Sequence, residues 1–148
     1  MFDTQMNMDA DCLMSLDEPQ KIAFLRAFSK MASVDGRFDD CEKEFIRHAG
    51  IHLGISRDKV QDILKSFDTK KILQEVAIIT NRRAALELIK ELCVLAHADE
   101  KLTDDEVLFI GQVGEAMGIE PQKIEQISNW VIDRLIWLNQ GKIIFEEV

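Results

Sequence analysis

The chain has 148 residues, and its 27 acidic and 18 basic residues give a formal net charge of −9. This length predicts a single domain, and 47% hydrophobic residues are enough to form a sizeable core. The excess of acid argues against nucleic-acid binding, which needs a basic face, and against adsorption to anionic membranes.

The three cysteines and the lack of long apolar runs indicate the cellular compartment of the protein. The cysteine count is odd and no Cys-x-x-Cys pair occurs, so we expect reduced thiols rather than a disulfide framework. No apolar run approaches the roughly 18 residues of a membrane span, and the first residues lack the features of a signal peptide. We therefore expect a cytoplasmic protein without membrane insertion.

Apolar residues recur at helical spacing, which predicts an all-α fold, a compact bundle of about seven helices. We expect a partly disordered N-terminal tail over 1–15 and one helical domain over 16–148. Pro19 and Pro121 suit the first turns of helices, and Gly54 and Gly118 suit helix ends. The predicted helices span about 19–34, 40–53, 57–67, 69–79, 82–98, 104–117 and 121–139.

The last predicted helix carries both tryptophans of the chain, Trp130 and Trp137, seven residues apart on one face. Packing in the core is the default prediction for this face, and a groove for a partner is the alternative, because tryptophan concentrates binding energy. Gly141 is predicted to end the helix. The apolar residues 143–145 would then dock as an extended segment.

An internal repeat appears when the sequence is shifted by 64 residues. Residues 32–63 then align without a gap to residues 96–127, and eleven of these 32 pairs are identical. The bundle is therefore predicted to consist of two helix–acidic loop–helix repeats, with halves at about 20–67 and 82–138. The identical pairs are Ala32/Ala96, Asp35/Asp99, Asp40/Asp104, Glu42/Glu106, Phe45/Phe109, Ile46/Ile110, Gly50/Gly114, Gly54/Gly118, Ile55/Ile119, Lys59/Lys123 and Ile63/Ile127.

Helix capping explains some of the acidic residues that the two repeats share. Asp39 with Glu42, and Thr103 with Glu106, have the spacing of capping boxes that open the second and sixth helices. Acids in the first turn also interact favourably with the helix dipole. Capping does not explain Asp35 and Asp99, because each follows a predicted helix at the end that disfavours an anion.

Cation binding is the alternative explanation. Asp35, Asp40 and Glu42, and likewise Asp99, Asp104 and Glu106, place three carboxylates near each loop, and hard cations prefer such oxygen ligands. The spacing is not that of an EF-hand, since the third position from Asp35 is Arg37. Both explanations remain open at this point, and Ca²⁺, Mg²⁺, Mn²⁺ and Zn²⁺ are the candidate ions.

Two short motifs resemble the signature of the tellurite-resistance TerB family, in which Ala-x-x-Asp-Gly precedes a glutamate at the next helix start. The first is residues 31–42 (MASVDGRFDDCE). Residues 95–106 (LAHADEKLTDDE) repeat it, but with Glu100 where the first copy has Gly36. The resemblance covers about 20–138 and implies an all-helical domain of two repeats. It also implies metal binding and a role in stress response, and some members are co-chaperone-type accessory modules.

The predicted function is therefore that of a non-enzymatic TerB-like protein with an acidic, cation-binding site, acting in metal or oxidant stress. The alternative is an interaction or co-chaperone-type module whose acidic loops only cap helices. We expect a protein partner of unknown identity in either case. No sequence motif for a catalytic nucleophile, a phosphate-binding loop or a dinucleotide site occurs.

Overall fold

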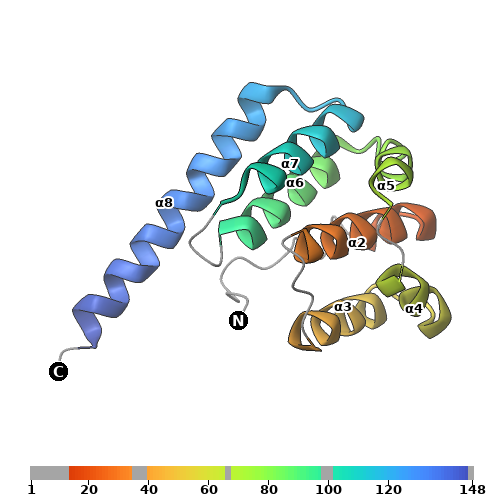
Figure 1. Ribbon diagram of the computed structural model, residues 1–148, viewed down its shortest axis with the longest axis horizontal. Coiled ribbons are helices and arrows are strands. Elements are labelled where there is room, and N and C mark those ends of the chain that lie inside the picture. Colours follow the sequence, from red (N-terminus) through yellow and green to blue (C-terminus); the bar gives the residue numbers. More distant parts are fainter. Residues whose placement is uncertain (1–13, 35–39, 66–67, 98–101, 147–148) are drawn as a thin grey trace.

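Seven helices and no strand occur in the part of the chain that the structure describes, residues 14–34, 40–65, 68–97 and 102–146 of a computed structural model (Figure 1). This confirms the all-α fold class. The helices are α2 (Glu18–Ser33), α3 (Asp40–His52), α4 (Arg57–Lys65), α5 (Thr69–Val76), α6 (Arg82–His97), α7 (Asp104–Ala116) and α8 (Pro121–Phe145).

Local sequence signals set most helix starts. The Asp17 side chain accepts a hydrogen bond from the Gln20 amide at 2.9 Å, and the Gln20 side chain accepts one from the Asp17 amide at 3.1 Å, which closes a capping box on α2. Asn81 accepts a hydrogen bond from the Ala84 amide at 3.1 Å and so caps α6. Residues 1–13 of the predicted tail lie outside the described residues, and Leu16 is buried in the core.

Helix α2 is central to the bundle, because it contacts α3, α4, α5, α6 and α7. Its Phe24 and Phe28 are almost completely buried. The same helix carries a buried arginine, Arg26, whose Nε lies 3.1 Å from Glu75 on α5 and whose Nη2 lies 3.6 Å from Asp62 on α4. One cation thus joins three helices, and because it is buried, loss of its acidic partner would destabilise the fold.

Two glycines allow neighbouring helices to approach closely. A Cβ atom on Gly50 of α3 would lie 2.5 Å from Cγ2 of Val60 on α4, and one on Gly114 of α7 would lie 2.3 Å from Cδ1 of Ile124 on α8. Both distances are too short for any side chain. A larger residue at either position would force the facing side chain to move, so both glycines serve close helix approach.

The chain reverses after α3 and after α7 in the same way. Gly54 and Gly118 have φ angles of 78° and 76°, a conformation that glycine adopts without strain. The Ile55 amide donates to the Gly50 carbonyl at 2.9 Å, and the Ile119 amide donates to the Gly114 carbonyl at 2.8 Å. The two turns therefore share one geometry at a separation of 64 residues, while the repeat of whole halves remains a prediction.

Helix α8 differs from its prediction. It continues through Gly141 to Phe145, so the predicted stop at Gly141 and the predicted extended segment at 143–145 are wrong. Nothing lies within 4 Å of the position of a Cβ atom on Gly141, and one exposed glycine costs only about 1 kcal/mol, which the helix-forming residues around it outweigh. Helix α5 is shorter than predicted and ends at Val76.

The far half of α8 projects beyond the other helices (Figure 1), and Val131 is its last buried residue. Trp130 and Trp137 are 53% and 62% exposed, so their predicted core packing is wrong. The spacing of the two tryptophans predicts that they share one face of the helix. It cannot predict that this face stays exposed, because that depends on where the bundle ends. No helix in the described ranges has the length and apolar character needed to cross a membrane.

Alanine substitutions at Gly50 and Gly111 test the close approach of helices. Val60 is β-branched and cannot easily turn away, so Gly50→Ala should lower the free energy of unfolding by about 1–3 kcal/mol. Gly111 lies within α7 with nothing within 4 Å of its Cβ position, so Gly111→Ala should raise it by about 0.5–1 kcal/mol. Urea denaturation measures both changes in the free energy of unfolding. Equal changes for the two variants would contradict a close approach of helices at Gly50.

Candidate functional site

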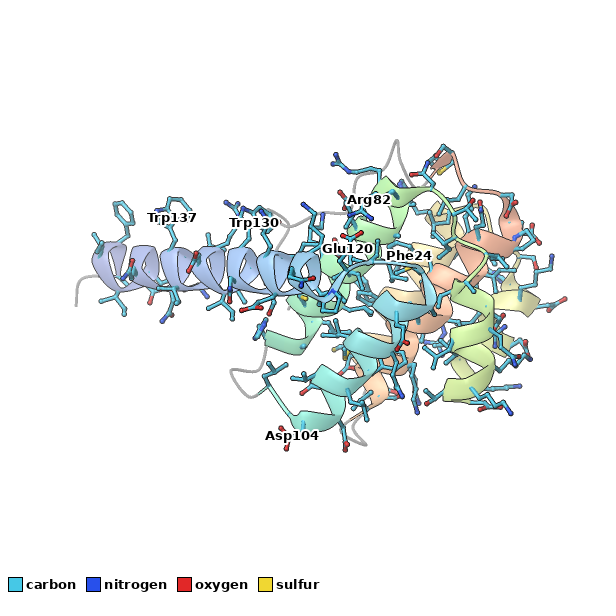
Figure 2. The ribbon with its side chains drawn as sticks, turned by 90° about the horizontal axis from the view of Figure 1, so that it is seen from above. Phe24, Arg82, Asp104, Glu120, Trp130 and Trp137 are labelled. Atoms are coloured by element: carbon cyan, nitrogen blue, oxygen red, sulfur yellow. The ribbon has the colours of Figure 1, made fainter. Side chains whose placement is uncertain are left out.

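The second acidic loop leads into a capped helix. At the start of α7, Glu106 donates its amide to Thr103 Oγ1 at 3.2 Å, and its carboxylate accepts from the Thr103 amide at 3.0 Å. This confirms the predicted capping box. Glu106 is buried, while Asp104 and Asp105 are exposed in the first turn, where they favour the positive end of the helix dipole (Figure 2).

The first acidic loop is only partly described. Asp40 is exposed and Glu42 half-buried in the first turn of α3. Asp35 and Asp99 lie outside the described residues, as does Asp39 of the other predicted capping box. The structure thus places four of the six predicted ligands, two on α3 and two on α7.

Within the ranges that the structure describes, no three His, Cys, Asp or Glu side chains gather closely enough to hold a metal ion. The predicted cation site depends on Asp35 and Asp99, so it stays a prediction. Capping accounts for the position of Glu106 without a ligand.

A charged cluster on α6 was not predicted. Lys90 Nζ lies 2.6 Å from Glu87 and 3.4 Å from Glu91, and Arg83 Nη2 lies 3.1 Å from Glu87. Both glutamates are buried. The spacing of these four residues marks one helix face, but a charged face is normally interpreted as solvated, and nothing in the sequence shows otherwise.

Burial raises the pKa of Glu91 to about 7. Loss of hydration disfavours its charged form and is the largest cause, the Lys90 ammonium opposes it, and the neighbouring Glu87 carboxylate adds to it. Glu91 therefore titrates well above the usual range of a glutamate.

A groove of about 800 Å³ lies between the end of α6, the outer side of α7 and the first turns of α8. Its volume is in the upper range for ligand pockets. Among the described residues, the lining is mostly apolar and includes three acids and one histidine, with no lysine or arginine. The lining residues are Cys93, His97, Leu102, Val107, Ile110, Gly111, Glu115, Gly118, Ile119, Glu120, Pro121, Ile124, Glu125, Ser128 and Asn129.

Polar side chains meet at one end of this groove. His97 Nε2 lies 3.2 Å from Ser128 Oγ. Burial raises the pKa of the Cys93 thiol to about 12, although a hydrogen bond with Ser128 acts in the opposite direction, so the thiol is protonated at neutral pH. A Ser–His contact is not by itself a catalytic site, because catalysis also needs an orienting group and oxyanion donors.

Glu120 at the start of α8 is held by Arg82 at the start of α6 (Figure 2). The guanidinium donates to its two carboxylate oxygens at 3.1 and 2.8 Å. This hydrogen bonding lowers the pKa of Glu120 and raises that of Arg82. The pair fixes one end of the groove, and Glu115 and Glu125 remain as exposed acids along it.

Helix α8 exposes two faces beyond the groove. Trp130, Trp137 and Ile144, at steps of seven, form what we call the tryptophan flank, and Figure 2 shows both tryptophans on the same side of α8. Ile132, Ile136, Asn139 and Ile143 form the groove flank, which continues the face that carries Glu125 and Asn129 in the groove wall. At 3.6 residues per turn the two flanks lie about a third of a turn apart.

Residues 63–129 match the family model described as "Tellurite resistance protein TerB". This confirms the predicted resemblance to the family over a shorter stretch than the 20–138 expected. The matched residues include the second acidic loop and the groove. They end one residue before Trp130, so the projecting half of α8 lies outside the match. No curated protein sequence and no solved structure matches the chain at a significant level.

The raised pKa of Glu91 makes stability depend on pH. An acid with a higher pKa in the folded than in the unfolded state binds protons more tightly when folded, so its stabilising effect is present at low pH. That effect is lost as the pH rises from 4.5, the pKa of an unperturbed glutamate, to about 7, the pKa of Glu91 in the folded protein. We therefore compare the free energy of unfolding of Glu91→Gln with that of wild type at each pH. The difference in favour of the variant should be about 1–3 kcal/mol larger at pH 8 than at pH 4.

Denaturant unfolding of both proteins from pH 4 to pH 8 measures this difference. Glu125→Gln, at an exposed position on α8, is the matched control. A difference between wild type and Glu91→Gln that stays constant over the whole pH range would contradict a buried, titrating Glu91.

Proposed function

We propose that the chain is a non-enzymatic, TerB-like interaction module that recruits a partner protein through the projecting half of α8. The observation that carries the proposal is the exposure of this half. Trp137 is 62% exposed, Ile144 63% and Phe145 87%. The largest apolar patch on a monomer is typically about 300–600 Å² and is often functional.

The size of the exposed apolar surface supports this function. An aromatic side chain presents about 150–250 Å², so Trp130, Trp137 and Phe145 alone leave about 400 Å² uncovered. A helix that is apolar on most of its circumference is normally buried against something. Residues 133–145 carry two bases and one acid, so electrostatic repulsion from an acidic partner is weak.

The tryptophan flank offers geometry suited to a protein partner. Two tryptophans at a spacing of seven residues present side chains along one line, as in helix-in-groove recognition. The Arg134 guanidinium lies 5.9 Å from the Trp137 ring, within range of a cation–π contact that restrains both side chains. A restrained aromatic side chain loses less entropy on binding, which favours affinity.

The test is capture of partners by crosslinking in cells, comparing wild type with the double variant Trp130→Ala/Trp137→Ala. Because exposed residues contribute little to folding, the variant should keep its thermal stability within about 0.5 kcal/mol. Recovery of a discrete partner should fall by about thirtyfold or more, since buried tryptophan contacts often contribute over 2 kcal/mol.

Gln140→Ala, at an exposed polar position on the same helix, is the matched control and should leave capture unchanged. The captured partner should remain in the presence of EDTA. A set of captured proteins that is the same for wild type and the double variant would refute the proposal.

Cation binding at the acidic loops is the second candidate function, with a role in metal or oxidant stress. The occurrence of Asp35 and Asp99 in equivalent positions supports it, as does the family match across the second loop. Capping does not account for these two residues, and their carboxylates suit Ca²⁺, Mg²⁺ or Mn²⁺.

Calorimetric titration with Ca²⁺, Mg²⁺, Mn²⁺ and Zn²⁺ tests this second function. At least one ion should bind and raise the melting temperature, since an ion that binds only the folded state stabilises it. Asp99→Asn and Asp35→Asn should each weaken binding, whereas Asp133→Asn on α8 should not. The absence of both heat and thermal shift with all four ions would exclude the function.

A further inference from the structure

We infer that the groove beside α8 receives the projecting half of α8 from a second copy of the chain. The inference rests on the proposed function in taking this half as a binding segment, but it uses the groove flank rather than the tryptophan flank. In the pair, each chain would supply one helix end and one groove.

The first argument is the continuity of the groove flank along α8. Glu125 and Asn129 line the groove, and Ile132, Ile136, Asn139 and Ile143 follow at alternating steps of three and four residues. One helix face thus runs from the groove wall into the projecting half, where Ile136 is 51% and Ile143 71% exposed. Alternating steps of three and four are the spacing with which paired helices pack.

The second argument is symmetry. Residue 133 is the midpoint of α8, and a two-fold axis there would set two copies of the helix antiparallel. The last turns of each helix would then lie beside the first turns of the other, which line the groove. An isologous contact of this kind closes after two copies and leaves neither groove unfilled.

The third argument is charge complementarity. Among the described residues, the groove is lined by Glu115, Glu120 and Glu125 and by one basic side chain, His97, and Glu120 already binds Arg82. The projecting half and the residue that follows it, 133–146, carry no net charge in a chain of net charge −9, because Arg134 and Lys142 balance Asp133 and Glu146. Arg134 lies over the Trp137 ring on the tryptophan flank, so Lys142 is the base left for the groove. An apolar segment that carries Lys142 would therefore meet an apolar groove that carries Glu115.

The register places particular charges together. The turn at Gly118 reverses the chain between α7 and α8, so Glu115 near the end of α7 lies level with the first turn of α8. In the antiparallel pair, Lys142 of one copy would lie beside the first turn of α8 of the other copy. Lys142 would thus lie near Glu115 of the second copy, and Ile143 would face the apolar wall at Pro121 and Ile124.

Sedimentation equilibrium over a range of concentrations tests the inference. Wild type should form a dimer, and Ile136→Asp/Ile143→Asp should weaken it by about a hundredfold, because two carboxylates per chain would be buried without partners. Trp137→Ala and Ile144→Asp, on the tryptophan flank, are matched controls and should leave the dimer unchanged.

Charge reversal tests the pairing in trans. Glu115→Lys and Lys142→Glu should each weaken dimerisation by about tenfold, because each homodimer would contain two like-charge contacts. An equimolar mixture of the two variants should restore it, since both contacts in the mixed dimer then join opposite charges. Lys71→Glu on α5 is a control for the change in net charge.

A protein that is monomeric at all concentrations would overturn the inference, as would a dimer insensitive to the groove-flank and charge variants. Binding of the monomer to phosphatidylcholine vesicles through Ile136 and Ile143 would also overturn it, in favour of a lipid surface. A monomer that still captures a partner through Trp137 would refute the dimer and leave the proposed function intact. A monomer that captures no partner would refute both the dimer and the proposed function.

Discussion

The close approach of α7 and α8 at Gly114 determines the form of the second half of the molecule. Because Gly114 has no side chain, Ile124 can pack directly on α7. Gly118, with its positive φ, lets the chain reverse within a few residues. Together they set the direction in which α8 leaves the bundle, and its 25 residues are too many to remain in contact with it.

The groove and the two exposed flanks follow from this direction. The first turns of α8 pack on α6 and α7, where Val131 is fully buried, and they form one wall of the groove. The later turns have no such support, so their apolar residues face solvent on two sides. A surface of this kind is unfavourable in an isolated monomer, which is why we attribute binding to it rather than a structural role.

The sequence predicts the local features of this protein well, because they depend on neighbouring residues. The capping box of Thr103 and Glu106 and the helix ends at Gly54 and Gly118 follow from short-range spacing. The end of α8 and the exposure of Trp130 and Trp137 do not, because they depend on where the bundle ends.

The candidate sites divide in the same way. The acidic loops were visible as a repeated pattern, whereas the groove and the buried Glu87 and Glu91 require helices that are distant in sequence to meet. Helical spacing shows that Glu87 and Glu91 share a face, but only the packing shows that this face is buried.

The central claim is that the projecting half of α8 binds a protein surface, and hydrogen exchange of its backbone amides tests it most directly. In dilute protein, amides of residues 133–145 should exchange quickly, because few tertiary contacts hold this half. At high concentration the same amides should exchange at least about tenfold more slowly, while α2 stays unchanged. Equal exchange rates in this half at both concentrations, and with cell extract added, would contradict the account.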